Sequence, residues 1–187
     1  MGGEIAQTLA IEHPTRVRSL TTMMATTGAP SVGQAHPETM RALFGGPPAR
    51  TREEVVARAV RSLAAIGSPA FPTAPAATAE VAGLAYDRDH DELAIARQAV
   101  ASVVSGDRTE RLRALDVPAL VVHGLADTLR DPSGGRATAA AIPGAELVLV
   151  EGMGHDLPPG LWERLADHIA AVVQKGEARV LALGRSA

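Results

Sequence analysis

Several kinds of residue or segment are missing or scarce in this sequence of 187 residues, and each absence excludes particular kinds of site or of protein. There is no cysteine, which excludes disulfide bonds, thiolate zinc sites and a cysteine nucleophile. No apolar run approaches the ~18 residues of a membrane-spanning helix. The first residues also lack the basic and then apolar pattern of a signal peptide. We therefore expect a cytoplasmic protein that does not associate with a membrane.

Acidic and basic residues nearly balance, and aromatic side chains are scarce. The formal net charge is -3, which gives no reason to expect nucleic acid or an anionic membrane surface as a partner. One Trp, one Tyr and two Phe offer few aromatic anchors for a ligand, and nothing in the sequence indicates a cofactor. Hydrophobic residues still make up 46% of the chain, which is enough for a single domain with a buried core.

The chain opens with Met-Gly-Gly-Glu-Ile-Ala-Gln, the start of a predicted helix that lacks a capping side chain. From residue 4 to residue 12 apolar side chains recur one turn apart, with Ile5 and Leu9 on one face. Pro14 ends the helix, because the residue before a proline is pushed out of the helical region. The two glycines at the helix start indicate that another element packs very close to the backbone there.

The middle of the chain, residues 28–105, differs from the rest in being rich in Pro, Gly and Ala. Its clearest predicted helix begins at Thr51, where Glu54 completes a capping box. Prolines and serines in residues 68–79 predict a connection without regular structure. A further helix is expected around residues 93–100.

The flanking parts of the chain alternate strands with helices. Apolar runs predict buried strands at residues 117–124 and 146–150, and residues 17–24 are also expected to form a buried strand. Helices are expected at residues 133–141 and from Leu161 onward. This alternation predicts an α/β fold with a parallel sheet covered on both faces. In such a sheet the reactive groups lie in loops at the carboxyl ends of the strands.

Two of these strand ends carry an acid and a histidine. Asp127 follows the strand at 117–124, and His155 follows the strand at 146–150 within a glycine-rich loop. An acid and then a histidine form the back half of the order Ser-Asp-His. In that arrangement the acid holds the imidazole in one tautomer while the ring relays a proton for a nucleophile. We therefore expect Asp127 and His155 to lie within hydrogen-bonding distance.

Other interpretations of these residues stay open. Asp131 and Asp156 compete with Asp127 for the role of the acid, and an ordinary loop histidine is the alternative for His155. His123 lies at a strand end, where its ring can bond to the backbone, and is best explained as structural. A metal site built from His123, Asp127 and His155 has suitable side chains, but their spacing matches no standard ligand pattern.

Four motifs, in this order, resemble those of the α/β-hydrolase family. Met1-Gly2-Gly3 is similar to the last three positions of the family's nucleophile elbow, Gly-x-Ser-Met-Gly-Gly. His13-Pro14 is similar to the end of the following helix. The segment from His123 to Asp127 is similar to the family's acid-bearing strand end, and Gly152-Met153-Gly154-His155 is similar to its histidine loop. The resemblance extends over nearly the whole chain.

The resemblance implies an N-terminally truncated α/β-hydrolase sheet, with residues 1–27 and 106–187 as a partial core and residues 28–105 as a small helical lid. The nucleophilic serine would directly precede Met1. Met1 itself would supply an oxyanion-hole donor, here a free amine in place of a peptide N–H. The sequence contains no Gly-x-Ser-x-Gly, and the residues at 28–33 have the wrong spacing.

The function implied is hydrolysis of a small ester, lactone or related acyl substrate through Ser, Asp127 and His155, without a cofactor or metal. The chain alone is then expected to be inactive. The alternative is a non-catalytic pseudo-hydrolase that acts as a binding or assembly module. Without the nucleophile strand, the edge of the strand at 17–24 stays open, which predicts self-association. The following lid side chains predict an apolar acyl pocket, although core packing explains them equally well: Met40, Leu43, Phe44 and Phe71.

Overall fold

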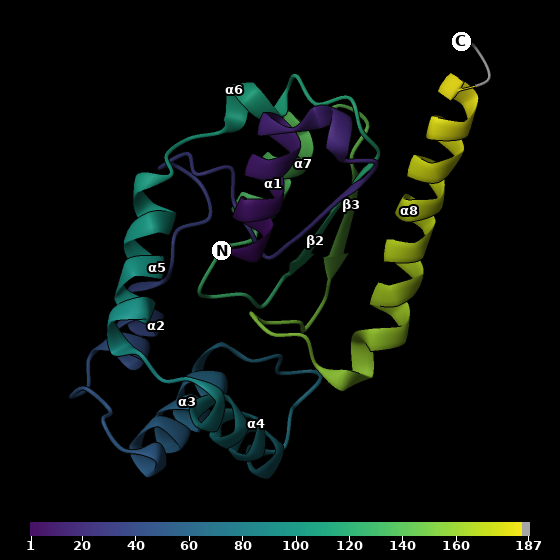
Figure 1. The fold of residues 1–187 in the computed structure, drawn as a ribbon. Helices are drawn as coiled ribbons and strands as arrows, with labels where there is room; N and C mark the ends of the chain where they lie inside the picture. The colour runs from purple at the N-terminus through teal and green to yellow at the C-terminus, as the bar shows by residue number, and fades with distance from the viewer. Residues whose placement is uncertain (185–187) are drawn as a thin grey trace.

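Three parallel strands form the sheet of the computed structural model, which describes residues 1–184 (Figure 1). The strands are β1 (Leu20–Met23), β2 (Ala119–Gly124) and β3 (Glu146–Val150). Their order is β1-β2-β3, and in register Thr22 lies opposite Val121 while Val122 lies opposite Val148. The predicted parallel sheet is confirmed. β1 is shorter than predicted: it begins at Leu20, after the 3₁₀ turn η1 (Pro14–Arg16) and a short connection, and it ends before Met24, whose φ of 49° is not strand backbone.

Helices cover both faces of this sheet (Figure 1). On one face Leu120 and Val122 of β2 form a buried apolar cluster with side chains of α8 (Trp162–Gly184). The other face carries α1 (Gly2–Glu12) and α7 (Ser133–Ala141), which contribute to a second cluster. Every residue of β2 is buried, as its continuous apolar sequence predicts. No helix within residues 1–184 combines the length and the apolar character needed to cross a bilayer.

The buried face of α1 differs from the apolar face that its sequence predicts. Glu4 is only 5% exposed, whereas the side chains of Ile5 and Leu9 are 61% and 51% exposed. Gly3 packs against β1, since a Cβ at this position would lie 2.6 Å from the Thr22 hydroxyl oxygen. Gly2 would meet nothing within 4 Å. The predicted close approach to the helix start is therefore real, and it takes place at Gly3.

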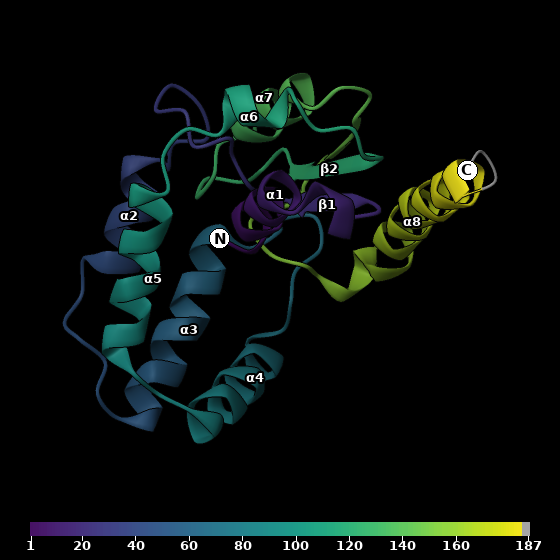
Figure 2. The same ribbon diagram turned by 45° about the horizontal axis from the view of Figure 1, so that its top comes forward.

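Four of the helices between β1 and β2 in the chain gather beyond the carboxyl ends of the strands (Figure 1 and Figure 2). They are α2 (Pro37–Phe44), α3 (Arg52–Ile66), α4 (Pro75–Arg88) and α5 (Glu92–Val104). The capping box of Thr51 and Glu54 starts α3 as predicted. The predicted connection at 68–79 is wrong in its last part, because Pro75 opens α4. A proline fits the first helical turn, where its missing N–H would have no intrahelical partner.

The remaining short elements connect these layers. A single turn of helix leads from the four-helix insertion into β2, and a 3₁₀ turn leads from the loop after β3 into α8. Their bounds are α6 (Thr109–Leu112) and η2 (Pro159–Leu161).

Candidate active site

β2 and β3 end side by side, and the loops that follow them are bonded to each other. The N–H of Leu125 donates to the carbonyl of Val150 at 2.9 Å, and the N–H of Ala126 donates to the carbonyl of Met153 at 2.9 Å. Gly124 is required at this crossing, since a Cβ there would lie 2.2 Å from the Met153 carbonyl oxygen. The two loops therefore hold their polar side chains in a fixed relation.

Asp127 and His155 meet at this edge of the sheet. Nδ1 of His155 lies 2.7 Å from Oδ2 of Asp127, so the predicted contact is confirmed. The other carboxylate oxygen accepts the backbone N–H groups of Leu129 at 2.9 Å and Arg130 at 2.8 Å. The Asp127 side chain is fully buried, whereas that of His155 is 24% exposed. A proton on Nδ1 leaves Nε2 of His155 with a free lone pair, as a general base needs.

The carboxylate of Asp127 stays ionised at neutral pH. Burial alone would raise the pKa of Asp127, because a low-dielectric site disfavours the charged form. The contacts from His123 and His155 and the backbone N–H of Arg130 outweigh burial and lower the pKa of Asp127 to about 2. The site therefore places a permanent negative charge against the ring of His155.

His123 is a second histidine against the same carboxylate. Its Nε2 lies 2.8 Å from the carbonyl oxygen of Arg130 and 3.4 Å from Oδ2 of Asp127. A carbonyl can only accept, so Nε2 of His123 carries the proton. The ring is fully buried and packs on Gly135, where a Cβ would lie 2.5 Å from Nδ1. The expected bond from His123 to backbone is confirmed, and it braces the loop that carries the acid.

The two competing acids are engaged elsewhere. Asp131 accepts the N–H of Ser133 at 2.9 Å, at the start of α7. Asp156 accepts the hydroxyl of Ser68. Of the three acids, Asp127 is the one that bonds to His155. Within residues 1–184 no group of three or more His, Asp or Glu side chains is arranged to hold a metal ion, so the geometry gives no support to a metal site.

The histidine loop is clamped to the end of α3, a feature that the sequence did not reveal. The N–H of His155 donates to the carbonyl of Ile66 at 2.7 Å, and the N–H of Gly154 donates to the hydroxyl of Ser68 at 2.9 Å. These contacts join residues more than 80 positions apart, and no local pattern signals them. A Cβ at Gly154 would lie 2.3 Å from the Ile66 carbonyl oxygen, so glycine permits this approach.

The helix α1 begins at the same edge of the sheet (Figure 1). Met1, at its N-cap, has its amino group 4.0 Å from the buried carboxylate of Glu4. That carboxylate accepts the hydroxyl of Ser102 at 2.7 Å and lies 3.7 Å from the guanidinium of Arg130, in the acid loop. Glu4 thus links α1 to the loop of Asp127. The role of Met1 as an oxyanion donor stays a prediction.

The four lid side chains named from the sequence have different surroundings. Phe71 packs against the apolar cluster under α8, which supports the core interpretation for this residue. Met40 is 42% exposed. Leu43 and Phe44 line a cavity between α2, α3 and α5. Of the four named side chains, Leu43 and Phe44 therefore line this cavity.

Comparison with known proteins places this geometry in a family. The family model described as alpha/beta hydrolase fold matches residues 1–159. Rhodomycin D methylesterase DnrP of Streptomyces peucetius is 30% identical over 192 residues, which cover 91% of this chain and 63% of that protein. The chain thus spans less than two thirds of this relative.

Solved structures share the fold at low sequence identity. The 2-hydroxy-6-oxo-6-phenylhexa-2,4-dienoate hydrolase of Rhodococcus sp. strain RHA1 is 19% identical, with a TM-score of 0.62 over 95% of this chain and 61% of that one. The enol-lactonase of Burkholderia xenovorans LB400 is 22% identical, with a TM-score of 0.56 over 95% of this chain and 63% of that one.

Proposed function

The chain belongs to the α/β-hydrolase fold family, and we propose that it carries the acid and the histidine of a hydrolase that cleaves a small ester, lactone or related acyl substrate. Asp127 is the acid and His155 is the general base. The nucleophile is a serine on the N-terminal side of Met1, and residues 28–105 form the lid. The observation that carries the proposal is the buried, ionised carboxylate of Asp127 bonded to Nδ1 of His155.

The reaction follows from this pair. Nε2 of His155 takes the proton of the serine hydroxyl as its oxygen attacks the acyl carbon, and Asp127 stabilises the imidazolium that forms. The same proton then passes to the leaving alcohol, and an acyl-serine remains. Water attacks this ester in turn, with Nε2 of His155 again accepting and returning a proton. The name of the 30% identical relative, a methylesterase, supports an ester as the substrate.

The position of α1 supports the placement of the nucleophile. Its N-terminal end lies at the edge where β2 and β3 end, and the orphan N–H groups of a first helical turn favour a developing negative charge. In a chain that continues upstream, the N–H of Met1 is a peptide donor for the oxyanion. Removal of one such donor costs ~10²–10³ in rate, and loss of a triad serine costs ~10⁶. We therefore expect residues 1–187 alone to be inactive.

The upstream DNA provides the first test. The codons directly before that of Met1 should encode Gly-x-Ser in frame. The second test compares esterase activity on a p-nitrophenyl ester for residues 1–187 and for the upstream-extended chain. The extended chain should turn over, and its His155→Ala variant should not. His168→Ala is the matched control, because this ring pairs with Glu146 at the surface, away from Asp127.

Two results would contradict the proposal. Turnover by residues 1–187 that His155→Ala abolishes would mean that the nucleophile lies within this sequence. An extended chain with an intact serine and no activity on esters or lactones would favour the non-catalytic binding module.

A further inference from the structure

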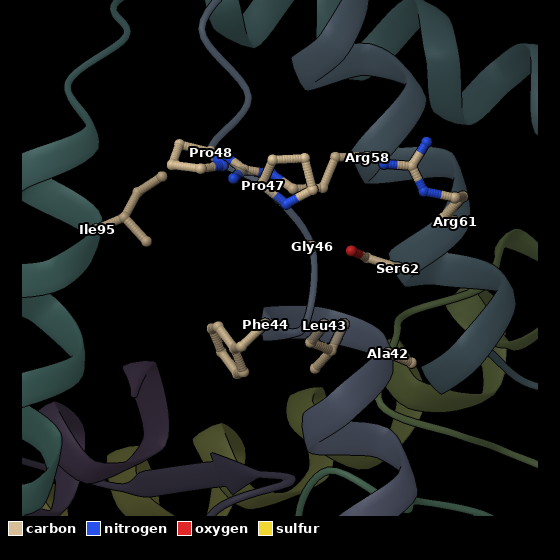
Figure 3. A pocket seen from close by; sticks show the side chains of 10 residues that line it. All are labelled: Ala42, Leu43, Phe44, Gly46, Pro47, Pro48, Arg58, Arg61, Ser62 and Ile95. Carbon is tan, nitrogen blue, oxygen red and sulfur yellow. The ribbon is translucent and has the colours of Figure 1, made fainter.

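A cavity of about 440 Å³ lies among the helices beyond the sheet, within the size range of small-molecule sites. Figure 3 shows its walls: α2 contributes Leu43 and Phe44, α5 contributes Ile95 from the opposite side, and α3 contributes Arg58 and Arg61. The apolar wall is not closed over, since Phe44 is 64% and Ile95 is 52% exposed. The cavity therefore offers apolar surface and positive charge together.

Both arginines are unpaired among the side chains that the structure describes. In the part of the chain that the structure describes, neither guanidinium makes an ion pair or hydrogen bond, whereas Arg52 on the same helix pairs with Asp87 at 2.7 Å. Glu54, one turn before Arg58, takes part in the capping box of α3 instead. One of its carboxylate oxygens accepts the N–H groups at the start of α3. Arg58 is nevertheless half-buried against the apolar wall.

We propose that this cavity binds an organic carboxylate with an apolar body, and that the two guanidinium groups of Arg58 and Arg61 hold the carboxylate. A planar guanidinium matches a carboxylate with paired N–H donors, and this match is stronger where water is partly excluded. The side chains of Leu43, Phe44 and Ile95 cover the apolar body. Ser62, on the same wall, adds a neutral hydroxyl.

The catalytic part of this inference rests on the proposed function. Helix α3 connects the cavity to the histidine loop. Ile66, whose carbonyl accepts the N–H of His155, lies five residues after Arg61 and eight after Arg58. At 1.5 Å per residue these separations are about 8 Å and about 12 Å along the helix. The substrate class that fits is an ester or lactone that also carries a free carboxylate and whose apolar body is at least as large as a small ring.

The test needs no catalysis and uses residues 1–187. Equilibrium dialysis measures binding of 2-naphthoate and of its neutral isostere 2-naphthamide, both followed by their fluorescence. We expect naphthoate to bind at least ~10-fold more tightly, an order expected for a charge-assisted pair. The double variant Arg58→Gln, Arg61→Gln should remove this preference. Arg136→Gln, Arg164→Gln is the matched control, because it removes two exposed charges on α7 and α8.

Three results would overturn the inference: equal binding of naphthoate and naphthamide to the unaltered chain, no binding of either, or an equal loss in the control variant. The first two need no variant, so a folding defect cannot obscure them. Failure of the proposed function is a separate result. An extended chain without esterase activity would leave naphthoate binding intact, whereas an active one that cleaves neutral and carboxylate-bearing esters equally well would refute the substrate class alone.

Discussion

Asp127→Asn is the substitution that tests the electrostatics of the site most sharply. It keeps the size of the side chain and one oxygen acceptor, and it removes the charge. In the structure the carboxylate is fully buried, bonds to His155 at 2.7 Å and has a pKa lowered from 3.8 to about 2. A group whose pKa falls on folding stabilises the folded state above its unfolded pKa, and this stabilisation is lost as the pH falls through the folded pKa.

The size of this contribution follows from the two pKa values of Asp127. The difference between 3.8 and about 2, at ~1.4 kcal/mol for each pH unit, amounts to about 2.5 kcal/mol at neutral pH. Roughly half of it should be lost by pH 3, and nearly all of it below pH 2. In the Asn variant this part of the pH dependence should be missing, because no proton binds at the position.

Urea unfolding at intervals between pH 3 and pH 6 measures the difference. Unaltered protein should lose about 1 kcal/mol more stability over this range than Asp127→Asn does. Asp116→Asn is the matched control, since Asp116 forms an exposed ion pair with Arg179 that contributes little. A free energy of unfolding that follows the same pH profile in unaltered and Asp127→Asn protein would refute the assignment of a buried, ionised Asp127.

Three further outcomes follow from other contacts. Gly3→Ala should lower the free energy of unfolding by ~1–3 kcal/mol because its Cβ would meet Thr22, while Gly2→Ala, with nothing in reach, should not destabilise; equal melting temperatures would contradict this. Ser68→Ala should speed hydrogen exchange at the Gly154 amide, whose acceptor it removes, and unchanged protection would argue against the clamp. Residues 1–187 should self-associate in light scattering through the open edge of β1, and a monomer with a sharp melt would contradict that expectation.

Local sequence signals predicted the elements whose ends they mark. Helix α7 and strand β3 begin and end at the predicted residues, since each is a periodic or continuous apolar segment bounded by turn residues. Thr51 and Glu54 likewise marked the start of α3. By contrast, α4 was missed because its start, Pro75 among alanines, reads equally well as a loop. The exposed Ile5 shows that helical periodicity finds an apolar face without showing which partner covers it.

The contact between the acid and the histidine was predictable, because it depends on where the strands end. Asp127 and His155 each follow a strand, and adjacent parallel strands bring such residues together, as the 2.7 Å contact shows. The second contact to Asp127, from His123, needs the path of the acid loop, which sequence does not give. The clamp from Ser68 joins parts of the chain 86 residues apart, so it is purely tertiary.

We propose that Asp127 and His155 activate a serine at the edge of the sheet where β2 and β3 end. The most direct measurement is labelling of the upstream-extended chain with a fluorophosphonate, which reacts with an activated serine, followed by mass spectrometry of the peptides. We expect one adduct, on the serine directly before Met1, that forms at least ~10³-fold more slowly in His155→Ala and at an unchanged rate in His168→Ala. An adduct on a serine within residues 1–187, or labelling at the same rate without the His155 ring, would contradict it.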